Sequence, residues 1–456
     1  MKFSDYSEPA DYSGIFWRNI EKVQSLSLDP LVVGLLSLIE TTFELPNELL
    51  SCQFKRYLQN QHEYCPINLH RRPWRRLMFV FSLVYAGARS AFIRTRGHSD
   101  VLLDTWYPEC EHSFYGSDML DQLGRQHRLL RLNISGYKKL SFNDLLRSVP
   151  KYLKAHALAE KIWELHRIDL YHFLFFAFRC GLMGQHIKSN YAPKCIISGN
   201  DNGFPAIVAG AAGADLILIQ NGMRAASDGS YSFANIYISM GGPQMMPARV
   251  RAGCRFSEIF YWGSIRLHHA NAKIVPDPQT IASFDVLFVS SIEDIGGTDG
   301  VFKGFYSRSD ERMVLRIIKE YAEGTDARVA YSCRYAAEIT DLKALGLFSE
   351  QITYFAHGDH SPYSLVAQSR YTLSSGSTMT VEALAMGMKG GFINTSGNIE
   401  VNVGTLGAGV EYTSSEWEGL SLFLFELDSK VGTMKDYVVQ NPAFVKEFVA
   451  LMASRY

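Results

Sequence analysis

The chain has 456 residues, of which 47% are hydrophobic and 13% aromatic, and its formal net charge at pH 7 is -1. This length and composition can bury a large core, and we expect two domains rather than one. The near-neutral charge excludes a general electrostatic attraction to nucleic acid or any other polyanion.

The N-terminus, MKFSDYSEPADYSG, is acidic and polar where a signal peptide needs a basic start and an apolar run. Seven cysteines are scattered along the chain without a CxxC pair, which disfavours a disulfide framework and a zinc cluster. We therefore expect a cytoplasmic protein.

Two apolar stretches, residues 77–88 and 170–184, are shorter than the roughly 20 residues that cross a bilayer. We expect both to be buried core segments. A basic and aromatic cluster precedes the first of them: Arg71, Arg72, Trp74, Arg75 and Arg76. The cluster is typical of a solvated surface, but it could also hold the protein at anionic lipid on the inner membrane face. No nucleic-acid-binding motif accompanies it, so a nucleic-acid partner is not expected.

The first half of the chain predicts one Rossmann-like domain, residues 1–265, with helical insertions such as 144–166. Its expected strands lie at 101–107 and 127–134, in a strand-helix-strand unit within 187–223, and at 235–242 and 257–265. A polar segment with two prolines follows at 266–283 and is interpreted as the interdomain linker.

The second half alternates apolar strand-length runs with amphipathic helical runs. The strands are expected at 285–291, 327–333, 351–358, 371–375 and 390–394, and the helices at 311–324, 336–347, 362–369 and 378–387. This pattern predicts a parallel sheet covered on both faces, hence a second Rossmann-like domain over 284–440. A C-terminal helix is expected at 441–456.

A hydroxyl-rich turn lies between the strand at 371–375 and the next helix. It contains Ser375, Gly376, Ser377 and Thr378, and Glu382 stands on the same helix face as Thr378. Ligands of open α/β sheets bind beyond the carboxyl ends of strands, where helix N-termini present N–H groups. The turn therefore predicts a phosphate site, with Glu382 placed to accept bonds from ribose hydroxyls. Alternatively, Ser377 caps a core helix and Glu382 supports its first turns.

The stretch GSTMTVEALAMGMKGGFIN, together with two Rossmann-like domains, a linker and a C-terminal helix, resembles the donor-binding half of GT-B glycosyltransferases. The likeness is nearest to bacterial surface-polysaccharide enzymes, including Kdo and sialic-acid transferases that use CMP-sugars, and it covers most of residues 190–395. It implies a GT-B architecture, two Rossmann-like domains facing a central cleft, with the donor nucleotide on the second domain and a glycan acceptor on the first.

The same resemblance implies cleft residues in the first domain. In LIQNGMR, residues 218–224, Asn221 occupies the place of a residue that faces the cleft, with Gln220, Gly222 and Arg224 beside it. Related enzymes carry a nucleophilic Asp in a similar turn, so an amide at this position indicates orientation rather than attack. Asp201 is the expected base for the acceptor hydroxyl, although an Asx-turn explains it equally well. Arg224 could neutralise a substrate carboxylate or simply lie on the surface.

Further donor contacts are expected from HGDHSPYS, residues 357–364, where His360 could bond a phosphate and Ser361 caps the helix before Pro362. His357 is expected at the end of the preceding strand. Ser290 and Ser291 follow another strand and would face the donor, and Gly263 with Ser264 forms a turn near the crossing between domains. Hinge chemistry explains these last four residues as well.

The leading hypothesis is a metal-independent glycosyltransferase of bacterial surface-polysaccharide assembly. Metal independence is expected because the chain contains no Asp-x-Asp pair that would hold a metal on the donor. No cofactor is expected besides the nucleotide-sugar substrate, and the acceptor is a glycan or lipid-linked glycan. Two alternatives remain open at this point: a non-hydrolysing sugar-nucleotide 2-epimerase, and a catalytically decayed glycan-binding protein of the same fold.

Overall fold

The computed structural model describes residues 25–46, 48–64, 97–105, 114–134, 142–166, 168, 170–200, 205–222, 232–243, 254–271, 283–291, 294–297, 301–302, 306–395, 410–430 and 439–456. The predicted lipid-contact cluster at residues 71–76 and the apolar stretch at 77–88 lie outside these ranges. Asp201 and Arg224 also lie outside them.

The first sheet is six-stranded and parallel throughout, in the order β2-β1-β3-β4-β5-β6. Its strands are β1 (Val101–Asp104), β2 (Leu129–Leu132), β3 (Cys195–Ser198), β4 (Asp215–Ile219), β5 (Phe233–Ile238) and β6 (Arg255–Phe260). Successive side chains of a strand point to opposite faces, so Leu102 and Ile196 enter one core while Leu103 and Ile197 enter another. Both faces of this sheet are therefore covered.

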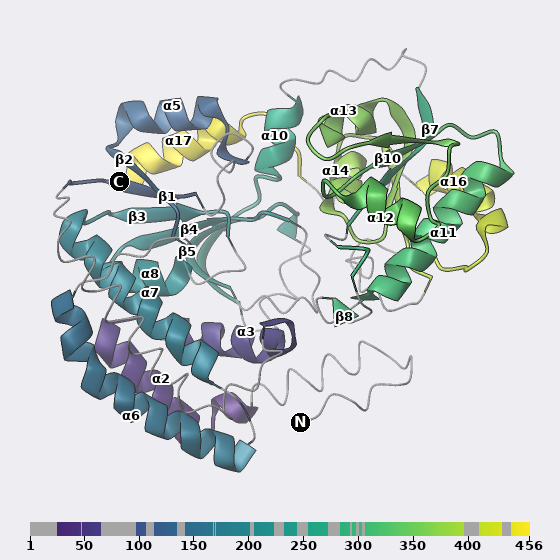
Figure 1. Ribbon diagram of the computed structural model, residues 1–456. Helices are drawn as coiled ribbons and strands as arrows, with labels where there is room; N and C mark the ends of the chain where they lie inside the picture. The colour runs from purple at the N-terminus through teal and green to yellow at the C-terminus, as the bar shows by residue number, and fades with distance from the viewer. Residues whose placement is uncertain are drawn as a thin grey trace.

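The helices around this sheet form unequal layers (Figure 1). One face carries α5 (Ser117–Gln126) and the C-terminal helix α17 (Phe444–Arg455), and the other carries α7 (Tyr171–Asn190) and α8 (Pro205–Ala212). Beyond α7 lies a further layer that contains α2 (Pro30–Phe43) and α6 (Phe142–His166), while α3 (Leu49–Tyr64) packs against α8 and β5. We call this sheet with its helices the first domain.

The second sheet is also six-stranded and parallel, in the order β11-β10-β7-β12-β13-β14. Its strands are β7 (Phe284–Val289), β10 (Val329–Ser332), β11 (Ile352–Phe355), β12 (Ser369–Ser374), β13 (Lys389–Ile393) and β14 (Glu411–Tyr412). Counted in chain order, this is 3-2-1-4-5-6, the strand order of the dinucleotide-binding fold. A short hairpin of β8 (Val301–Phe302) and β9 (Tyr306–Ser307) lies outside the sheet.

The second sheet and its helices form the second domain. The helices are α11 (Arg308–Gly324), α12 (Glu338–Ala344), α13 (Pro362–Ala367), α14 (Thr378–Ala385) and α16 (Leu420–Lys430), with a 3-10 turn at Trp417–Gly419. The predicted strands and helices of residues 284–394 are all present, with ends shifted by a few residues. The two Rossmann-like sheets expected from the sequence are thus confirmed.

Two segments differ from the sequence-based expectations. Residues 187–190 end helix α7 instead of starting a strand. The apolar stretch 170–184, which was expected to be buried, lies in the same largely buried helix. Residues 265–271, at the start of the predicted linker, form helix α10 (Ile265–Asn271). The expected C-terminal helix is present, and it packs on the first domain because Phe444, Phe448 and Met452 join the core on that face.

Among the described residues, no helix combines the length and the apolar character needed to cross a membrane.

Candidate functional site

The second sheet reverses its strand order between β7 and β12, and open α/β sheets bind ligands outside the carboxyl ends of strands at such a point. Strand β7 ends at Val289 and β12 at Ser374, so Ser290, Ser291 and the hydroxyl-rich turn all follow at this edge. The backbone N–H of Gly376 donates to Ser291 Oγ at 3.2 Å, which ties the two strand ends together. The structure therefore brings these sequence-predicted residues to one place.

The turn before α14 has the geometry of a capped helix start. Ser377 is the N-cap, as expected, and its Oγ accepts from the N–H of Met379 at 3.3 Å. Ser374 Oγ accepts from the N–H of Ser377 at 3.0 Å. The N–H groups of Gly376 and Ser377 are thus already bonded, to Ser291 at the end of β7 and to Ser374 at the end of β12. A ligand oxygen would meet the exposed Gly376 and the half-buried Ser377 and Thr378, together with the hydroxyl of Ser291.

Ser375 and Ser290 were expected to face a ligand, but they do not face outward. Both are buried, and neither hydroxyl makes a hydrogen bond of ordinary geometry among the described residues; instead Ser375 lies close enough to Glu311, and Ser290 to Glu338, to lower the pKa of those buried carboxyls. Beneath the turn, Glu311 of α11 is fully buried, and its carboxylate oxygens have no hydrogen bond of normal geometry in the described structure. Burial raises the pKa of Glu311 to about 7, while the Ser375 hydroxyl and the Ser291 backbone oppose this shift. Ser375 therefore belongs to the buried floor of the turn.

The first sheet has its own reversal of strand order, between β1 and β3. There Asp104, the last residue of β1, is fully buried and accepts from Ser198 Oγ at 2.7 Å and from the N–H of Ile134 at 2.9 Å. Burial raises the pKa of Asp104 to about 6, and these two hydrogen bonds lower it. The Tyr115 hydroxyl donates to the Asp104 carbonyl and accepts from the N–H of Gly199.

Asp104 was missed by the sequence analysis. Its only signal there is a carboxylate at the end of an apolar run, VLLD. This network fixes residues 198–200 at the end of β3.

The loop after β4 is held from below by Gln220, which is buried. Its side-chain amide donates to the Gly222 carbonyl at 2.7 Å, and its oxygen accepts from the N–H of Met240 at 3.0 Å. Gln220 therefore positions the loop instead of facing a ligand. Gly222 is buried against the second domain, since a Cβ at this position would lie 3.0 Å from Thr378 Oγ1.

The two domains meet at Glu382 of α14, which is buried. Ser264 Oγ of the first domain donates to Glu382 Oε1 at 2.5 Å, and the Tyr363 hydroxyl donates to Oε2 at 2.8 Å. Burial raises the pKa of Glu382, whereas the bond from Ser264 and the nearby positive charge of Arg266 lower it. Glu382, the residue predicted to bind the ribose, thus also makes a polar contact between the two domains.

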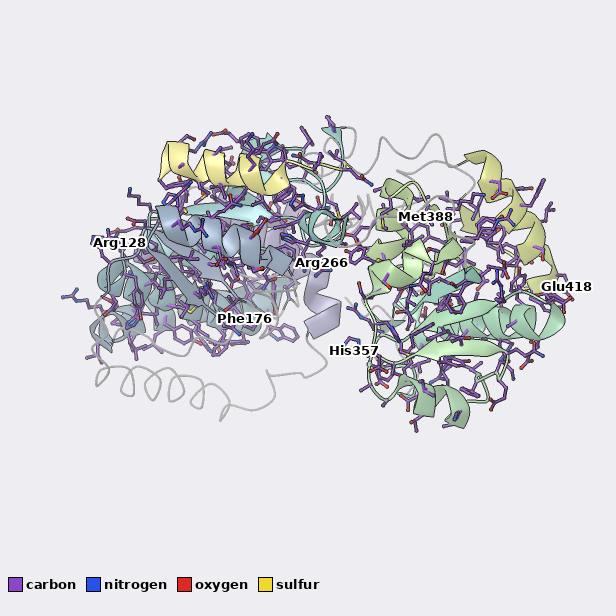
Figure 2. The ribbon with its side chains drawn as sticks, turned by 90° about the horizontal axis from the view of Figure 1, so that it is seen from above. Arg128, Phe176, Arg266, His357, Met388 and Glu418 are labelled. Carbon is purple, nitrogen blue, oxygen red and sulfur yellow. The ribbon has the colours of Figure 1, made fainter. Side chains whose placement is uncertain are left out.

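Arg266 lies in the first turn of α10, at the side of the first domain nearest the second (Figure 2). Its guanidinium donates to Asn221 Oδ1 and lies 5.5 Å from the centre of the Phe114 ring. The sequence analysis missed both Arg266 and Tyr363. Arg266 was assigned to the linker because its segment shows no helical period. Tyr363 was not singled out because nothing in the local sequence marks its hydroxyl.

Gly263 precedes this helix with a φ of 84°, a left-handed conformation that favours glycine. A Cβ there would overlap the carbonyl oxygen of Val439, so the chain passes very close at this crossing. The Val439 N–H donates to the Met240 carbonyl of the first domain, and the Gln440 side chain donates to the Ala385 carbonyl of the second. The returning chain therefore binds both domains beside Ser264.

The side chains of residues 357–361 make fewer contacts than expected. His357 lies in a turn beyond β11 and not in the strand, and it is exposed, as are His360 and Ser361. The His360 ring packs edge-on against Phe355. Ser361 occupies the N-cap of α13 and Pro362 the first helical position, but the Ser361 side chain makes no cap hydrogen bond.

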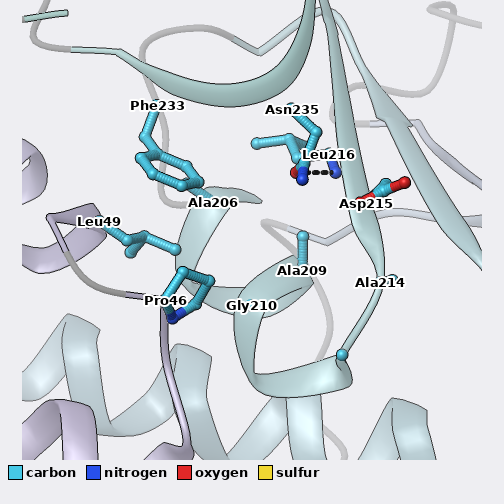
Figure 3. Close-up of a pocket in the computed structure, with 11 residues that line it drawn as sticks. Pro46, Leu49, Ala206, Ala209, Gly210, Ala214, Asp215, Leu216, Phe233 and Asn235 are labelled. Carbon is cyan, nitrogen blue, oxygen red and sulfur yellow. Dashed lines mark hydrogen bonds between the residues drawn. The ribbon is translucent and has the colours of Figure 1, made fainter. Parts of the chain in front are cut away.

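A cavity of about 220 Å³ lies in the first domain, lined mainly by apolar residues of α3, α8, β4 and β5 (Figure 3). Asp215 and Phe233 on its wall begin β4 and β5. The cavity is therefore at the amino ends of the strands, on the opposite edge of the sheet from Asn221, and belongs to a different part of the molecule.

Comparison with known proteins finds no matching family model and no matching curated protein. Among solved structures, a putative UDP-N-acetylglucosamine 2-epimerase from Listeria monocytogenes is similar, with 12% identity over 78% of this chain and 96% of that one and a TM-score of 0.47. The UDP-GlcNAc 2-epimerase from Neisseria meningitidis bound to UDP-GlcNAc is 12% identical over 83% and 98%, with a TM-score of 0.43.

The wall teichoic acid polymerase TagF is 11% identical over 88% of this chain and 97% of its own, with a TM-score of 0.45. The assignment of the fold depends on the two sheets of the chain itself. It is an α/β protein with two Rossmann-like domains, the architecture expected of the GT-B superfamily.

Proposed function

We propose that this chain is a GT-B glycosyltransferase that moves a sugar from a nucleotide-sugar to a glycan acceptor. One observation carries the proposal: at the switch point of the second sheet, Thr378 of the hydroxyl-rich turn adjoins Gly222 of the first domain, and Glu382 of the following helix bonds Ser264 of that domain. A donor held by the turn would thus present its sugar to residues of the other domain.

The donor phosphate would bind outside Gly376, Ser377 and Thr378, at the N-terminus of α14. Ser291 Oγ accepts from the Gly376 N–H and keeps its own proton, which it can donate to a phosphate oxygen. These donors stabilise the negative charge that develops on the leaving nucleotide. The resemblance of the turn to CMP-sugar transferases favours a CMP-sugar as the donor.

Glu382 would hold the ribose, and because its side chain is buried at the contact between the domains, a ribose hydroxyl would reach it only when the domains move apart at this point. Each carboxylate oxygen can accept two hydrogen bonds, and Ser264 and Tyr363 take one on each oxygen. A ribose hydroxyl approaching Glu382 would therefore complete a site built from both domains. This arrangement would couple donor binding to the contact between the domains.

The acceptor would lie on the first domain, near Asn221 and Arg266. In the proposed reaction Asp201 takes the proton of an acceptor hydroxyl, whose oxygen forms a bond to the anomeric carbon. The bond from that carbon to the phosphate oxygen breaks, and the nucleotide leaves with the electron pair. The acceptor class that the resemblance indicates is a glycan of bacterial surface-polysaccharide assembly, free or lipid-linked.

The first test is a thermal-shift panel with CMP, CDP, UDP and GDP on the full chain. We expect one nucleotide to raise the melting temperature, because a ligand that binds only the folded state stabilises it. The variant Ser377→Ala with Ser291→Ala should lose this shift, while Ser414→Ala, at an exposed loop of the second domain, should retain it. The absence of a shift with every nucleotide would contradict the proposal.

The second test follows a nucleotide-sugar of the preferred base. Release of the nucleotide with transfer of an unchanged sugar supports the transferase. Conversion of the sugar to an epimer while it remains on the nucleotide would instead establish an epimerase. Nucleotide binding without turnover of any donor would indicate a binding protein.

A further inference from the structure

We propose that the outer face of helix α6 binds an anionic lipid bilayer. This surface, which we call the α6 face, belongs to the layer beyond α7 and is far in sequence from the predicted cluster at residues 71–76. The inference does not depend on the proposed function.

The inner face of α6 is fully accounted for by the fold. Leu145, Tyr152, Ala155, Ala159 and Ile162 are buried in the core that includes α2 and α7. The outer face is thus not needed to cover the sheet. Figure 1 shows α6 at the edge of the first domain, with α7 between it and the strands.

The α6 face exposes large apolar side chains that a helix in water would normally bury. Leu146, Leu153 and Leu165 have exposed fractions of 53%, 57% and 67%. Leu28, just before α2, is 77% exposed. It lies near the C-terminal end of α6, where Leu165 is, because His166 Nε2 is 3.0 Å from the carboxylate of the neighbouring Asp29. The apolar groups therefore extend along the face and onto the residue that precedes the neighbouring helix.

The same face is basic. Arg147, Lys151, Lys154 and Lys161 are exposed, and none of the four makes a hydrogen bond or ion pair among the described residues. Glu164 is the one exposed acid of α6 in the described structure. Leucines interleaved with unpaired cations fit an interface where apolar side chains enter the headgroup boundary and the cations meet anionic lipid.

Charge decides between a bilayer and a second copy of this chain. A two-fold symmetric dimer through the α6 face would oppose the four cations of one copy to the same four of the other. Like charges at a dehydrated interface are repulsive, whereas anionic headgroups are attractive. The geometry therefore points to lipid.

Helix α16 of the second domain provides a matched contrast. Its Leu422 and Phe425 have exposed fractions of 63% and 70%, but the exposed acids nearby are Glu418 and Glu426. This second patch also exposes large apolar side chains, but the exposed charged residues beside them are acids instead of the cations of the α6 face. If exposed apolar area alone gave binding, both patches would act alike.

The experiment is co-sedimentation of the full chain with vesicles of phosphatidylcholine alone and of phosphatidylcholine mixed with phosphatidylglycerol. We expect binding only to the anionic vesicles, and weaker binding as salt is added. The variant Lys151→Glu with Lys154→Glu should lower the partition coefficient by about tenfold or more. Leu146→Ser with Leu153→Ser should also lower it, and Leu422→Ser with Phe425→Ser should leave it unchanged. Circular dichroism establishes that each variant is folded.

Three results would overturn the proposal. The first is no binding of the wild-type chain to anionic vesicles. The second is binding that the α6 variants leave intact while Arg75→Glu with Arg76→Glu abolishes it. The third is a dimer, measured by light scattering, that the Leu146→Ser and Leu153→Ser changes convert to a monomer without altering vesicle binding.

Discussion

Ser264 of the first domain donates a 2.5 Å hydrogen bond to Glu382 of the second, so a carboxylate expected to serve a ligand also joins the two domains. Tyr363 bonds the other oxygen of Glu382, and Arg266 contributes positive charge nearby. Any ligand that binds Glu382 would therefore act on the interface between the domains.

Glu382→Ala should lower the free energy of unfolding by about 2 kcal/mol, because it leaves the Ser264 and Tyr363 hydroxyls without an acceptor in a buried place. Glu382→Gln should recover most of this loss, since hydroxyls can reverse direction and accept from the amide. Urea denaturation measures both. Equal losses for the two variants would show that charge, and not hydrogen bonding, holds the contact.

Gly222→Ala should destabilise the protein by about 1 kcal/mol, because the added Cβ would lie 3.0 Å from Thr378 Oγ1. Removing that oxygen with Thr378→Ala in the same chain should restore the stability. Gly124→Ala in α5, where a Cβ meets nothing within 4 Å, is the matched control and should be neutral or stabilising. A Gly222→Ala loss that Thr378→Ala fails to relieve would argue against this close approach between the domains.

Glu311 should make stability depend on pH. Its pKa is raised by burial to about 7, so the folded state binds a proton that the unfolded state releases at lower pH. The stabilising effect of that proton is full below the unfolded pKa and is lost as the pH rises through about 7. The variant Glu311→Gln should therefore gain stability relative to wild type between pH 5 and pH 8.5, by no more than about 3 kcal/mol.

Denaturant unfolding of wild type and Glu311→Gln across this pH range measures the difference, with the exposed Glu350→Gln as control. A difference that does not change with pH would mean that Glu311 reaches solvent or a partner. The nearest acidic groups, Glu338 and Asp310, act in the same direction on the pKa of Glu311 and should be kept in place.

Asp104→Ala should cost about 3 kcal/mol of stability, because the Ser198 hydroxyl and the Ile134 N–H lose their acceptor inside the protein. The matched control is Asp100→Ala, which removes an ion pair to the exposed Arg128 and should cost much less stability than Asp104→Ala. Thermal and chemical unfolding of both variants would show whether the first-sheet switch point depends on Asp104.

Asp201→Asn should reduce the rate of sugar transfer by about 100-fold or more while leaving the nucleotide-induced thermal shift unchanged. The reason is that a base acts on the acceptor and not on the donor. A variant that loses both properties would place Asp201 in the structure of the first domain instead of in the reaction.

The sequence was sufficient where the signal is local. Alternating apolar runs predicted the strands and helices of the second domain, and the position of Ser377 before an apolar helix predicted its cap. It was insufficient for residues 265–271, because Leu267 is buried by elements far away in the chain and the short helix shows no clear period. Arg266 was therefore placed in a linker.

The sequence by itself determined the two parallel sheets and the position of the turn at 375–378 beyond a strand end, because side-chain periodicity and glycine or serine punctuation act over a few residues. Tertiary structure alone decided that Ser375 points into the core, that Ser264 and Tyr363 meet at Glu382, and that Gly222 lies against Thr378. These relationships depend on how two separately formed domains pack together. Side-chain direction across such a contact follows from the packing of distant elements, which no local pattern encodes.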